Sequence, residues 1–259
     1  MKKAQWYLAC LFILSLIAVP YQAFAFIGLD AGVGYWSQTP SGTLSYKATT
    51  AADTINLKDD LGLKKESKPY VRIKAELPLI LPNLYFVATP MSFEGTGSKA
   101  INFTYGGQPF NLNVPIQSKI KLDHYDLALF YPIPLLKTAT VGVLNAELGL
   151  NIRMIDFEGT ISQETLNRTE SKSMSLYVPM IYAGIQVTPI SLFSIEAEIR
   201  GIAYGENHYY DYTGRLKVMP IPILYIAGGY RAESLKIDAS DVKADIKFGG
   251  PFVEVGVSF

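Results

Sequence analysis

The segment from residue 69 to residue 79 alternates between apolar and polar side chains along its length. Val71 and Ile73 fall on one face of an extended chain, while Arg72 and Lys74 fall on the other. A period of two is the side-chain period of a β-strand, so the segment is predicted to be a strand. An arginine or lysine that faces the middle of a bilayer costs about 2–4 kcal/mol. If the apolar face meets lipid, the charged face must therefore line an enclosed interior.

The same alternation, or an apolar run of strand length, recurs along the rest of the chain. It marks residues 26–37, 69–79, 84–94, 116–131, 141–155, 174–188, 193–203, 209–219, 224–237 and 249–259. Hydrophobic residues make up 49% of the chain, yet beyond residue 25 no apolar run approaches the roughly 20 residues of a membrane helix. The ten segments predict an all-β fold, a transmembrane antiparallel up-and-down β-barrel. An eight-stranded barrel, with two strand pairs folded into loops, is the alternative.

The connections between these segments are of two kinds. Short connections that carry proline lie at 78–83, 132–134, 188–190 and 220–222. Proline ends a strand ladder and favours a turn. Longer polar connections lie at 38–67, 95–115 and 156–172. Short turns at one rim and longer loops at the other are typical of outer-membrane barrels, in which the short turns are periplasmic and the long loops extracellular.

The N-terminal residues have the pattern of a secretory signal peptide. Lys2 and Lys3 precede an apolar run over residues 4–19, and Ala23 and Ala25 fit the small-x-small rule for cleavage. Residues 1–25 are therefore predicted to be removed, leaving one barrel domain over residues 26–259. Cys10, the single cysteine of the sequence, lies in the apolar run. The exported chain is then expected to hold no disulfide and no cysteine-ligated metal.

The C-terminal segment combines strand alternation with a terminal aromatic residue. Val253, Val255, Val257 and Phe259 share one face of the last predicted strand. This pattern resembles the C-terminal signature of bacterial outer-membrane β-barrels, in which the terminal aromatic is read by the barrel-assembly machinery. Together with the signal peptide, the strands and the turns, it makes the whole chain resemble small Gram-negative outer-membrane β-barrel proteins without an assigned activity. That resemblance implies a location in the bacterial outer membrane, with membrane lipid and the assembly machinery as partners.

The inward faces of the predicted strands carry charged side chains of both signs. We expect a lumen network of Asp30, Arg72, Lys74, Glu76, Glu147, Arg153, Glu196, Glu198, Arg200, Arg215, Arg231 and Glu254. For the segment 84–94, the outward face is predicted to carry Tyr85, Val87, Met91 and Phe93. Buried charges must be paired and hydrogen-bonded. The network is therefore interpreted either as an ion-paired plug or as the lining of a narrow, porin-like channel for a small solute.

Few residues suggest catalysis or cofactor binding. His124 and Asp126 are two apart on one predicted strand, so their side chains point the same way and are the candidates for an acid–base pair. No phosphate-binding glycine loop, nucleophile elbow or zinc-ligand spacing is present, so neither a cofactor nor a metal is expected. Lys+Arg and Asp+Glu are both 23, which gives no basic excess for nucleic acid.

Three functional hypotheses remain open from the sequence. The first is a structural outer-membrane barrel or a narrow channel. The second is an outer-membrane barrel hydrolase that acts on lipid or peptide through His124. The third is a surface-binding or adhesion protein that uses the long extracellular loops, above all residues 38–67.

Overall fold

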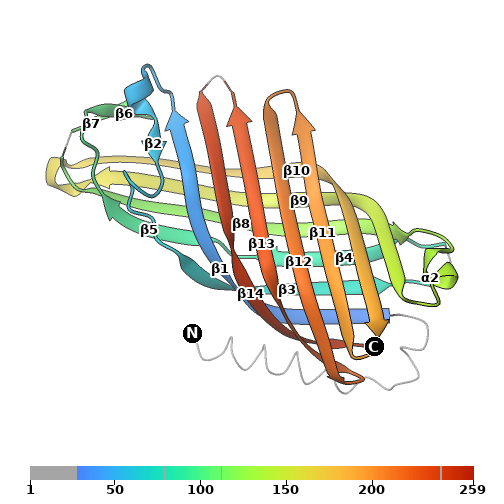
Figure 1. Cartoon of the computed structure of the whole chain (residues 1–259). Helices are drawn as coiled ribbons and strands as arrows, with labels where there is room; N and C mark the ends of the chain where they lie inside the picture. The colour runs from blue at the N-terminus through green and yellow to red at the C-terminus, as the bar shows by residue number, and fades with distance from the viewer. Residues whose placement is uncertain (1–27, 79, 112, 240) are drawn as a thin grey trace, which may run out of the picture.

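The computed structural model of the chain describes residues 28–78, 80–111, 113–239 and 241–259. The expected signal peptide lies outside these described residues. Within them, ten antiparallel barrel strands follow one another around a closed sheet (Figure 1). They are β1 (Gly28–Tyr46), β3 (Glu66–Glu76), β4 (Asn83–Thr89) continued by β5 (Ser92–Gly97), β8 (Ile116–Pro132), β9 (Leu144–Gln163), β10 (Arg168–Ile190), β11 (Phe193–Tyr204), β12 (Asn207–Ile221), β13 (Leu224–Asp238) and β14 (Val242–Ser258).

The barrel closes where the first strand meets the last. β1 pairs with β14 from Asp30 opposite Ser258 to Tyr46 opposite Val242. β4 and β5 form a single barrel strand, because both pair with β8 on either side of an interruption at Pro90. The predicted ten-stranded up-and-down barrel is therefore confirmed, and the eight-stranded alternative is wrong.

Along one half of the barrel's height, the outer face is apolar. Among the described residues, exposed apolar side chains on this face include Val33, Tyr35, Val71, Ile73, Leu84, Phe86, Leu127, Leu129, Leu150, Ile152, Ile226, Val253 and Val255. A closed barrel with this exterior and a charged interior is the arrangement of outer-membrane barrels, since lipid leaves no partner for an open sheet edge. The expected location, a bacterial outer membrane, is confirmed in these terms. No helix among the described residues is long and apolar enough to cross a bilayer.

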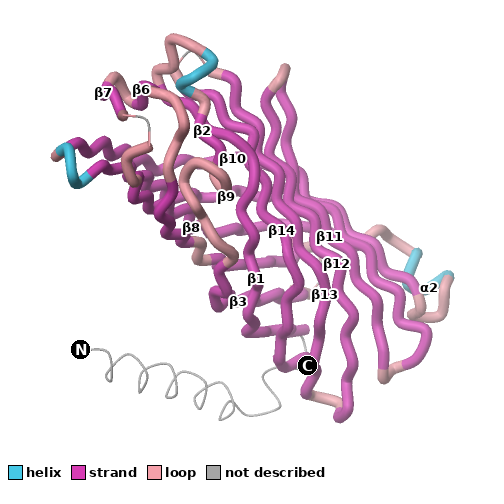
Figure 2. The backbone as a smooth tube through the Cα atoms, turned by 60° about the vertical axis from the view of Figure 1, so that its left-hand side comes forward, coloured by secondary structure: helices cyan, strands magenta, loops and turns pink. Residues whose placement is uncertain are grey.

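Beyond the apolar band, the barrel strands separate into two sheets. Pairing between β1 and β3 ends at Gln38 opposite Glu66, and pairing between β10 and β11 ends at Ile181 opposite Gly201. β1 continues to Tyr46, and β10 and β11 both extend past their last pair, so β1 and β11–β14 diverge from β5 and β8–β10 (Figures 1 and 2). The outward side chains at this level are polar, as at Lys119, Glu158, Lys243 and Lys247.

An apolar core fills much of the space between the two sheets. Its buried members include Trp36, Leu44, Phe93, Ile120 and Phe248, and the rings of Phe93 and Phe248 stack with centroids 5.4 Å apart. The segment between β1 and β3 forms a short helical turn, η2 (Ala51–Asp53), and then β2 (Ile55–Asn56), and it contributes Ile55, Leu57 and Leu61 to this core. A further hairpin of β6 (Phe103–Tyr105) and β7 (Gln108–Phe110) packs its two phenylalanines with centroids 5.1 Å apart.

Several sequence predictions of the connections are wrong. The expected loop 156–172 is mostly strand, because β9 and β10 extend beyond the apolar band and meet at a turn, η3 (Glu164–Leu166). The expected short connection at 132–134 is longer and contains a helical turn, α2 (Leu136–Ala139). At the extracellular end only the connections 47–65 and 98–115 are long, while β11–β12 and β13–β14 are joined by tight turns.

The face assignment of the segment 84–94 is also wrong. Tyr85, Val87, Met91 and Phe93 are buried in the interior, whereas Leu84 and Phe86 are exposed on the outside. Apolar residues occupy both faces of this strand, so a period of two identified the strand without distinguishing its faces. Phe93 packs in the core between the two sheets, and the Tyr85 hydroxyl meets a carboxylate in the lumen.

Asp53 ties the extracellular segments together. Its carboxylate accepts hydrogen bonds from the backbone N–H groups of Thr49 and Thr50, each at 2.8 Å, and of Thr104 at 2.6 Å. Burial by itself raises the pKa of Asp53, but these donors stabilise the charged form and hold its pKa well below the usual value.

We expect Asp53→Ala to free the segment 47–65, because each hydrogen bond to the charged carboxylate contributes about 1.5–3 kcal/mol. Tryptic cleavage within 47–65 should accelerate at least tenfold at neutral pH, whereas Asp59→Ala, an exposed aspartate of the same segment, should leave it unchanged. Because the pKa of Asp53 is lower in the folded protein than in the unfolded chain, its carboxylate stabilises the fold at pH values above the ordinary pKa of about 3.9. This stabilisation is lost as the pH falls through the lowered pKa of the folded protein. Wild-type protection measured with pepsin should therefore decline only well below pH 4, and equal cleavage of both variants would contradict this role.

Candidate functional site in the barrel interior

The interior of the barrel changes character along its axis. A polar cavity of about 270 Å³ opens at the periplasmic end, next to Gly28 and Phe259. Above it lies a layer of buried ion pairs, and above that the apolar core between the two sheets. We call the polar cavity the vestibule and the buried layer the charge layer, which comprises Arg72, Tyr85, His124, Asp126, Arg153, Glu198, Arg200, Asp211, Arg215, Arg231, Glu233 and Glu254.

The vestibule is lined by pairs of opposite charge. The Lys74 ammonium donates to both carboxylate oxygens of Glu147 at 2.7 Å. The Lys217 ammonium contacts Asp30 and lies 3.3 Å from a carboxylate oxygen of Glu196. Lys74 and Lys217 therefore each have a carboxylate beside them.

The lower part of the charge layer is organised around two glutamates. Glu254 accepts hydrogen bonds from the hydroxyls of Tyr70 at 2.6 Å and Tyr225 at 2.7 Å, and from the Arg72 guanidinium at 2.8 Å. A Cβ on Gly32 would collide with the Tyr225 hydroxyl. Glycine at this inward position therefore makes room for the network on the adjacent strands.

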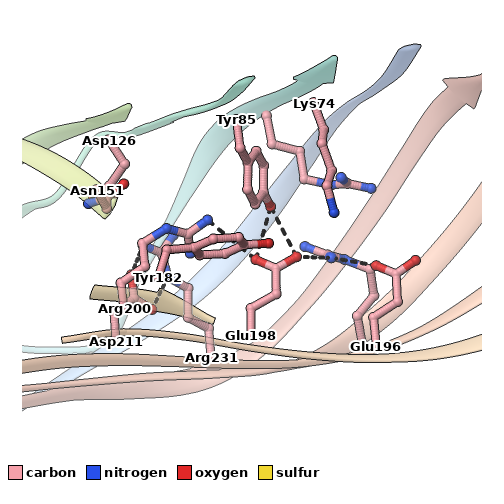
Figure 3. Close-up of polar contacts among 12 residues, drawn as sticks. Lys74, Tyr85, Asp126, Asn151, Tyr182, Glu196, Glu198, Arg200, Asp211 and Arg231 are labelled. Carbon is pink, nitrogen blue, oxygen red and sulfur yellow. Dashed lines mark hydrogen bonds and ion pairs between the residues drawn. The ribbon is translucent and has the colours of Figure 1, made fainter. Parts of the chain in front are cut away.

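Glu198 plays the corresponding part from β11, three strands from Glu254 on β14 (Figure 3). It accepts hydrogen bonds from the Tyr85 hydroxyl at 3.0 Å and from the guanidinium groups of Arg215 at 3.0 Å and Arg200 at 3.3 Å. The Arg200 guanidinium also lies 4.7 Å from the centroid of the Tyr85 ring. Stacking and hydrogen bonding together fix the planar guanidinium in one orientation.

The upper part of the charge layer is fully buried. Arg153 donates from Nε and one terminal nitrogen to the two carboxylate oxygens of Asp126, both at 2.8 Å, and also contacts Asp211. Arg231 in turn lies 2.7 Å from Asp211 and 2.9 Å from Glu233. Each of the three carboxylates therefore lies within hydrogen-bond distance of at least one of the two guanidinium groups.

His124 and Asp126 do not form the expected pair. Nε2 of His124 lies 3.2 Å from a carboxylate oxygen of Glu233, and Nδ1 lies 3.2 Å from the backbone oxygen of Leu122. Asp126 is instead held by Arg153, which stands directly opposite it on β9. His124 is fully buried, an environment that does not favour an acid–base role toward an external substrate.

His124, Asp211 and Glu233 also have ligand atoms within 4.8 Å of one another, a spacing suited to a metal ion. One terminal nitrogen of Arg231 lies 3.2 Å from Nε2 of His124 and within 2.9 Å of both carboxylates. The guanidinium thus takes the central place that a cation would need. The residues present do not fit a metal.

Every residue of the expected lumen network is on the inward face in the structure. Glu76 is exposed at the vestibule, whereas Arg72, Glu147, Arg153, Glu198, Arg200, Arg215, Arg231 and Glu254 are buried. The expected network omitted Glu233, Lys217, Tyr70, Tyr182 and Tyr225, which alternation places on the inner face and which are also bonded in the interior. It also omitted Tyr209, which bonds Glu233, and Tyr85, whose segment was assigned to the wrong face.

No protein-family model matches the chain, and comparison with curated proteins finds no match. Among solved structures, the chain is similar to the outer membrane protease OmpT from Escherichia coli, with 9% identity, a TM-score of 0.49 and coverage of 90% of this chain and 96% of that one. It is also similar to Ail, the attachment invasion locus protein of Yersinia pestis, with 12% identity, a TM-score of 0.37 and coverage of 90% and 99%. The translocator domain of the autotransporter NalP from Neisseria meningitidis gives 12% identity, a TM-score of 0.42 and coverage of 90% and 88%. No residue role carries over from proteins this dissimilar.

Removing one partner from the charge layer should strongly destabilise the barrel. Arg231→Met leaves Asp211 and Glu233 short of a counter-charge, and breaking a buried pair costs about 3–5 kcal/mol. The same substitution at Lys236, on the same strand, removes only an exposed contact with Glu206. Urea unfolding in lipid vesicles, followed by the heat-dependent gel migration of the folded barrel, should show a large loss for Arg231→Met and none for Lys236→Met. Equal midpoints would contradict the role given to the charge layer.

Proposed function

We propose that this protein is an integral outer-membrane barrel with a sealed lumen, acting as a structural or ligand-binding membrane protein and not as an open channel. The observation that carries this proposal is a set of contacts that cross the lumen between strands that are not neighbours. Lys74 on β3 reaches Glu147 on β9, and Tyr85 on β4 reaches Glu198 on β11. One level higher, Arg153 on β9 reaches Asp211 on β12.

The cross-lumen contacts involve every barrel strand. The strands contribute Asp30, Arg72, Tyr85, His124, Arg153, Tyr182, Glu198, Asp211, Glu233 and Glu254, in chain order, with Tyr182 taking part through its ring contact with Tyr85. Opening a path for solute would separate oppositely charged groups that burial has already removed from water, which costs several kcal/mol per ion. The apolar core above, with Trp36 beneath it, adds a second barrier to ions.

The two rival hypotheses have less support. A hydrolase that works through His124 would need a substrate to reach a fully buried ring held by Glu233. Adhesion through residues 38–67 would need a free loop, but β1 continues to Tyr46, and Leu57 and Leu61 are buried in the core. Adhesion therefore has only the remaining exposed positions of this segment to work with.

Planar-bilayer recording tests the sealed lumen. The refolded wild-type barrel is expected to insert without producing steps of constant conductance, because paired charges and apolar side chains occupy the lumen. Heat-dependent gel migration of protein recovered from the same preparation confirms that folded barrel was present. Long-lived unitary steps from the wild type would overturn the proposal.

Thiol labelling gives a second test in cells. Cys10 is the single cysteine and lies in the predicted signal peptide, so an introduced cysteine is expected to be the only thiol that the reagent can label in the exported chain. Ser194→Cys places a thiol in the vestibule, and Ser41→Cys places one on an exposed position of β1 at the extracellular half. A small membrane-impermeant reagent added outside intact cells should label Ser41→Cys and spare Ser194→Cys. Comparable labelling of both would mean that the lumen is open.

A further inference from the structure

An apolar cavity of about 270 Å³ lies between the two sheets in the extracellular half. Its walls come from both sheets, with Leu176 and Val178 on β10, Ile202 on β11, Leu235 on β13 and Ile246 on β14. The cavity is separate from the vestibule, because the charge layer lies between them. It belongs to none of the sites described above.

The cavity opens to the outside between β10 and β11. These strands stop pairing at Ile181 opposite Gly201, yet β10 extends back to Arg168 and β11 extends on to Tyr204. We call this unpaired stretch the slot. Apolar side chains from both of its edges line the cavity, so the slot is a gap in the wall and not merely a bend of the sheet.

The residues at the slot face inward but are exposed. Ile202 and Tyr204 share the parity of Arg200, which is buried in the charge layer, yet they are 37% and 85% exposed. On the facing edge, Met174 and Leu176 share the parity of the buried Tyr182 and are 39% and 38% exposed. Inward apolar side chains are normally covered by the neighbouring strand, and here that strand is missing.

The upper part of the slot lies outside the hydrocarbon band, whereas its lower end, where Pro179 pairs with Ile152, is level with lipid-facing side chains. Ser173, next to Met174, pairs with Glu158 on β9, whose side chain is exposed on the outer face. A charged side chain on the outside at this level places the upper part of the slot in the polar zone beyond the acyl chains. Bulk membrane lipid therefore does not cover the exposed apolar residues there, and a bound molecule would gain their burial.

The lining is also asymmetric. Its strongly polar side chains among the described residues are Asn207, His208 and Lys236, at the tip of β12 and the end of β13. Polar groups at one end and apolar walls elsewhere match an amphiphile with one head and one chain. The volume exceeds the roughly 150 Å³ of an apolar cavity that remains dry and takes up a small hydrocarbon, yet it is too small for a folded protein segment.

We propose that this cavity binds the acyl chain of a small single-chain amphiphile of the fatty-acid class, which enters through the slot. The chain lies between the two sheets, and the head stays in water at the end that carries Asn207, His208 and Lys236, whose ammonium donates to Glu206 at 3.0 Å. This assignment rests on the cavity and the slot and holds whether or not the lumen conducts.

Trp36 provides a built-in reporter. It is the single tryptophan beyond residue 25, and it is buried in the core that Leu44, Ile120 and Phe248 share with the cavity lining. A bromine atom at the end of a 12-carbon fatty acid should quench its fluorescence when the chain occupies the cavity. The experiment uses the full barrel in phospholipid vesicles without detergent, since detergent is itself an amphiphile with an apolar chain.

The expected result is saturable quenching of Trp36 that strengthens with chain length. Each methylene added inside the cavity should tighten binding about fourfold. Ile202→Arg places a charge in the slot and should weaken binding at least tenfold. The control is Ala203→Arg, the exposed and outward-facing neighbour on the same strand, which should change binding less than twofold.

Three results would overturn the proposal: no saturable quenching in the wild type, equal effects of the two arginine variants, or quenching by bromobenzene as strong as by the fatty acid. Equal quenching by bromobenzene would mean that the cavity binds small aromatic molecules and not an acyl chain. Heat-dependent gel migration verifies that each variant is folded. If Ile202→Arg does not fold, Leu176→Arg on the facing edge of β10 replaces it with the same expected loss.

Discussion

Pairing of buried charge is the constraint on which the rest of this structure depends. A closed barrel in lipid can carry ionised side chains only on its inner face, and a narrow interior provides little water to solvate them. Arg153 and Arg231 are therefore surrounded by Asp126, Asp211 and Glu233, and the Tyr209 hydroxyl donates to Glu233. Because the contacts run across the lumen, the same interactions that satisfy the charges also fix which strands face one another.

This constraint explains why charged pairs and then an apolar core follow one another along the barrel axis. Charged pairs lie behind the lipid-facing band, where closure of the barrel is complete. Beyond the band the strands no longer need to form a continuous wall, because water can solvate open sheet edges there. The two sheets separate at β1/β3 and at β10/β11, and an apolar core around Phe93 and Phe248 replaces backbone pairing as the link between them.

The sequence predicted what alternation alone determines. Arg72 and Lys74 opposite Val71 and Ile73 were sufficient for a strand and for its inner face, and the same pattern elsewhere gave the strand number. Alternation did not distinguish the inner from the outer face of the segment 84–94, because both of its faces are apolar. It also missed the strand character of 156–172, because strands beyond the membrane carry polar residues outside and lose the lipid-facing signature.

The candidate site was less predictable, because contacts across a barrel depend on register and curvature. His124 and Asp126 do point the same way, but Arg153 stands opposite Asp126 on the neighbouring strand and forms an ion pair with its carboxylate. Glu233, the partner that His124 does have, comes from β13, on the other side of the lumen. The cavity between the sheets depends on where two ladders end, and no local pattern in the sequence marks those positions.

The cross-lumen pairs have a consequence for biogenesis. Consider a half-built barrel that had entered the bilayer with β1 to β9 alone. Lys74 would keep its partner Glu147, but Arg153 would lack Asp211 and Tyr85 would lack Glu198. Such an intermediate would hold Arg153 by Asp126 alone and would leave the Tyr85 hydroxyl without its carboxylate acceptor. Strand-by-strand insertion is therefore energetically uphill for this chain. We expect its curling and its translocation into the membrane to occur as one concerted event.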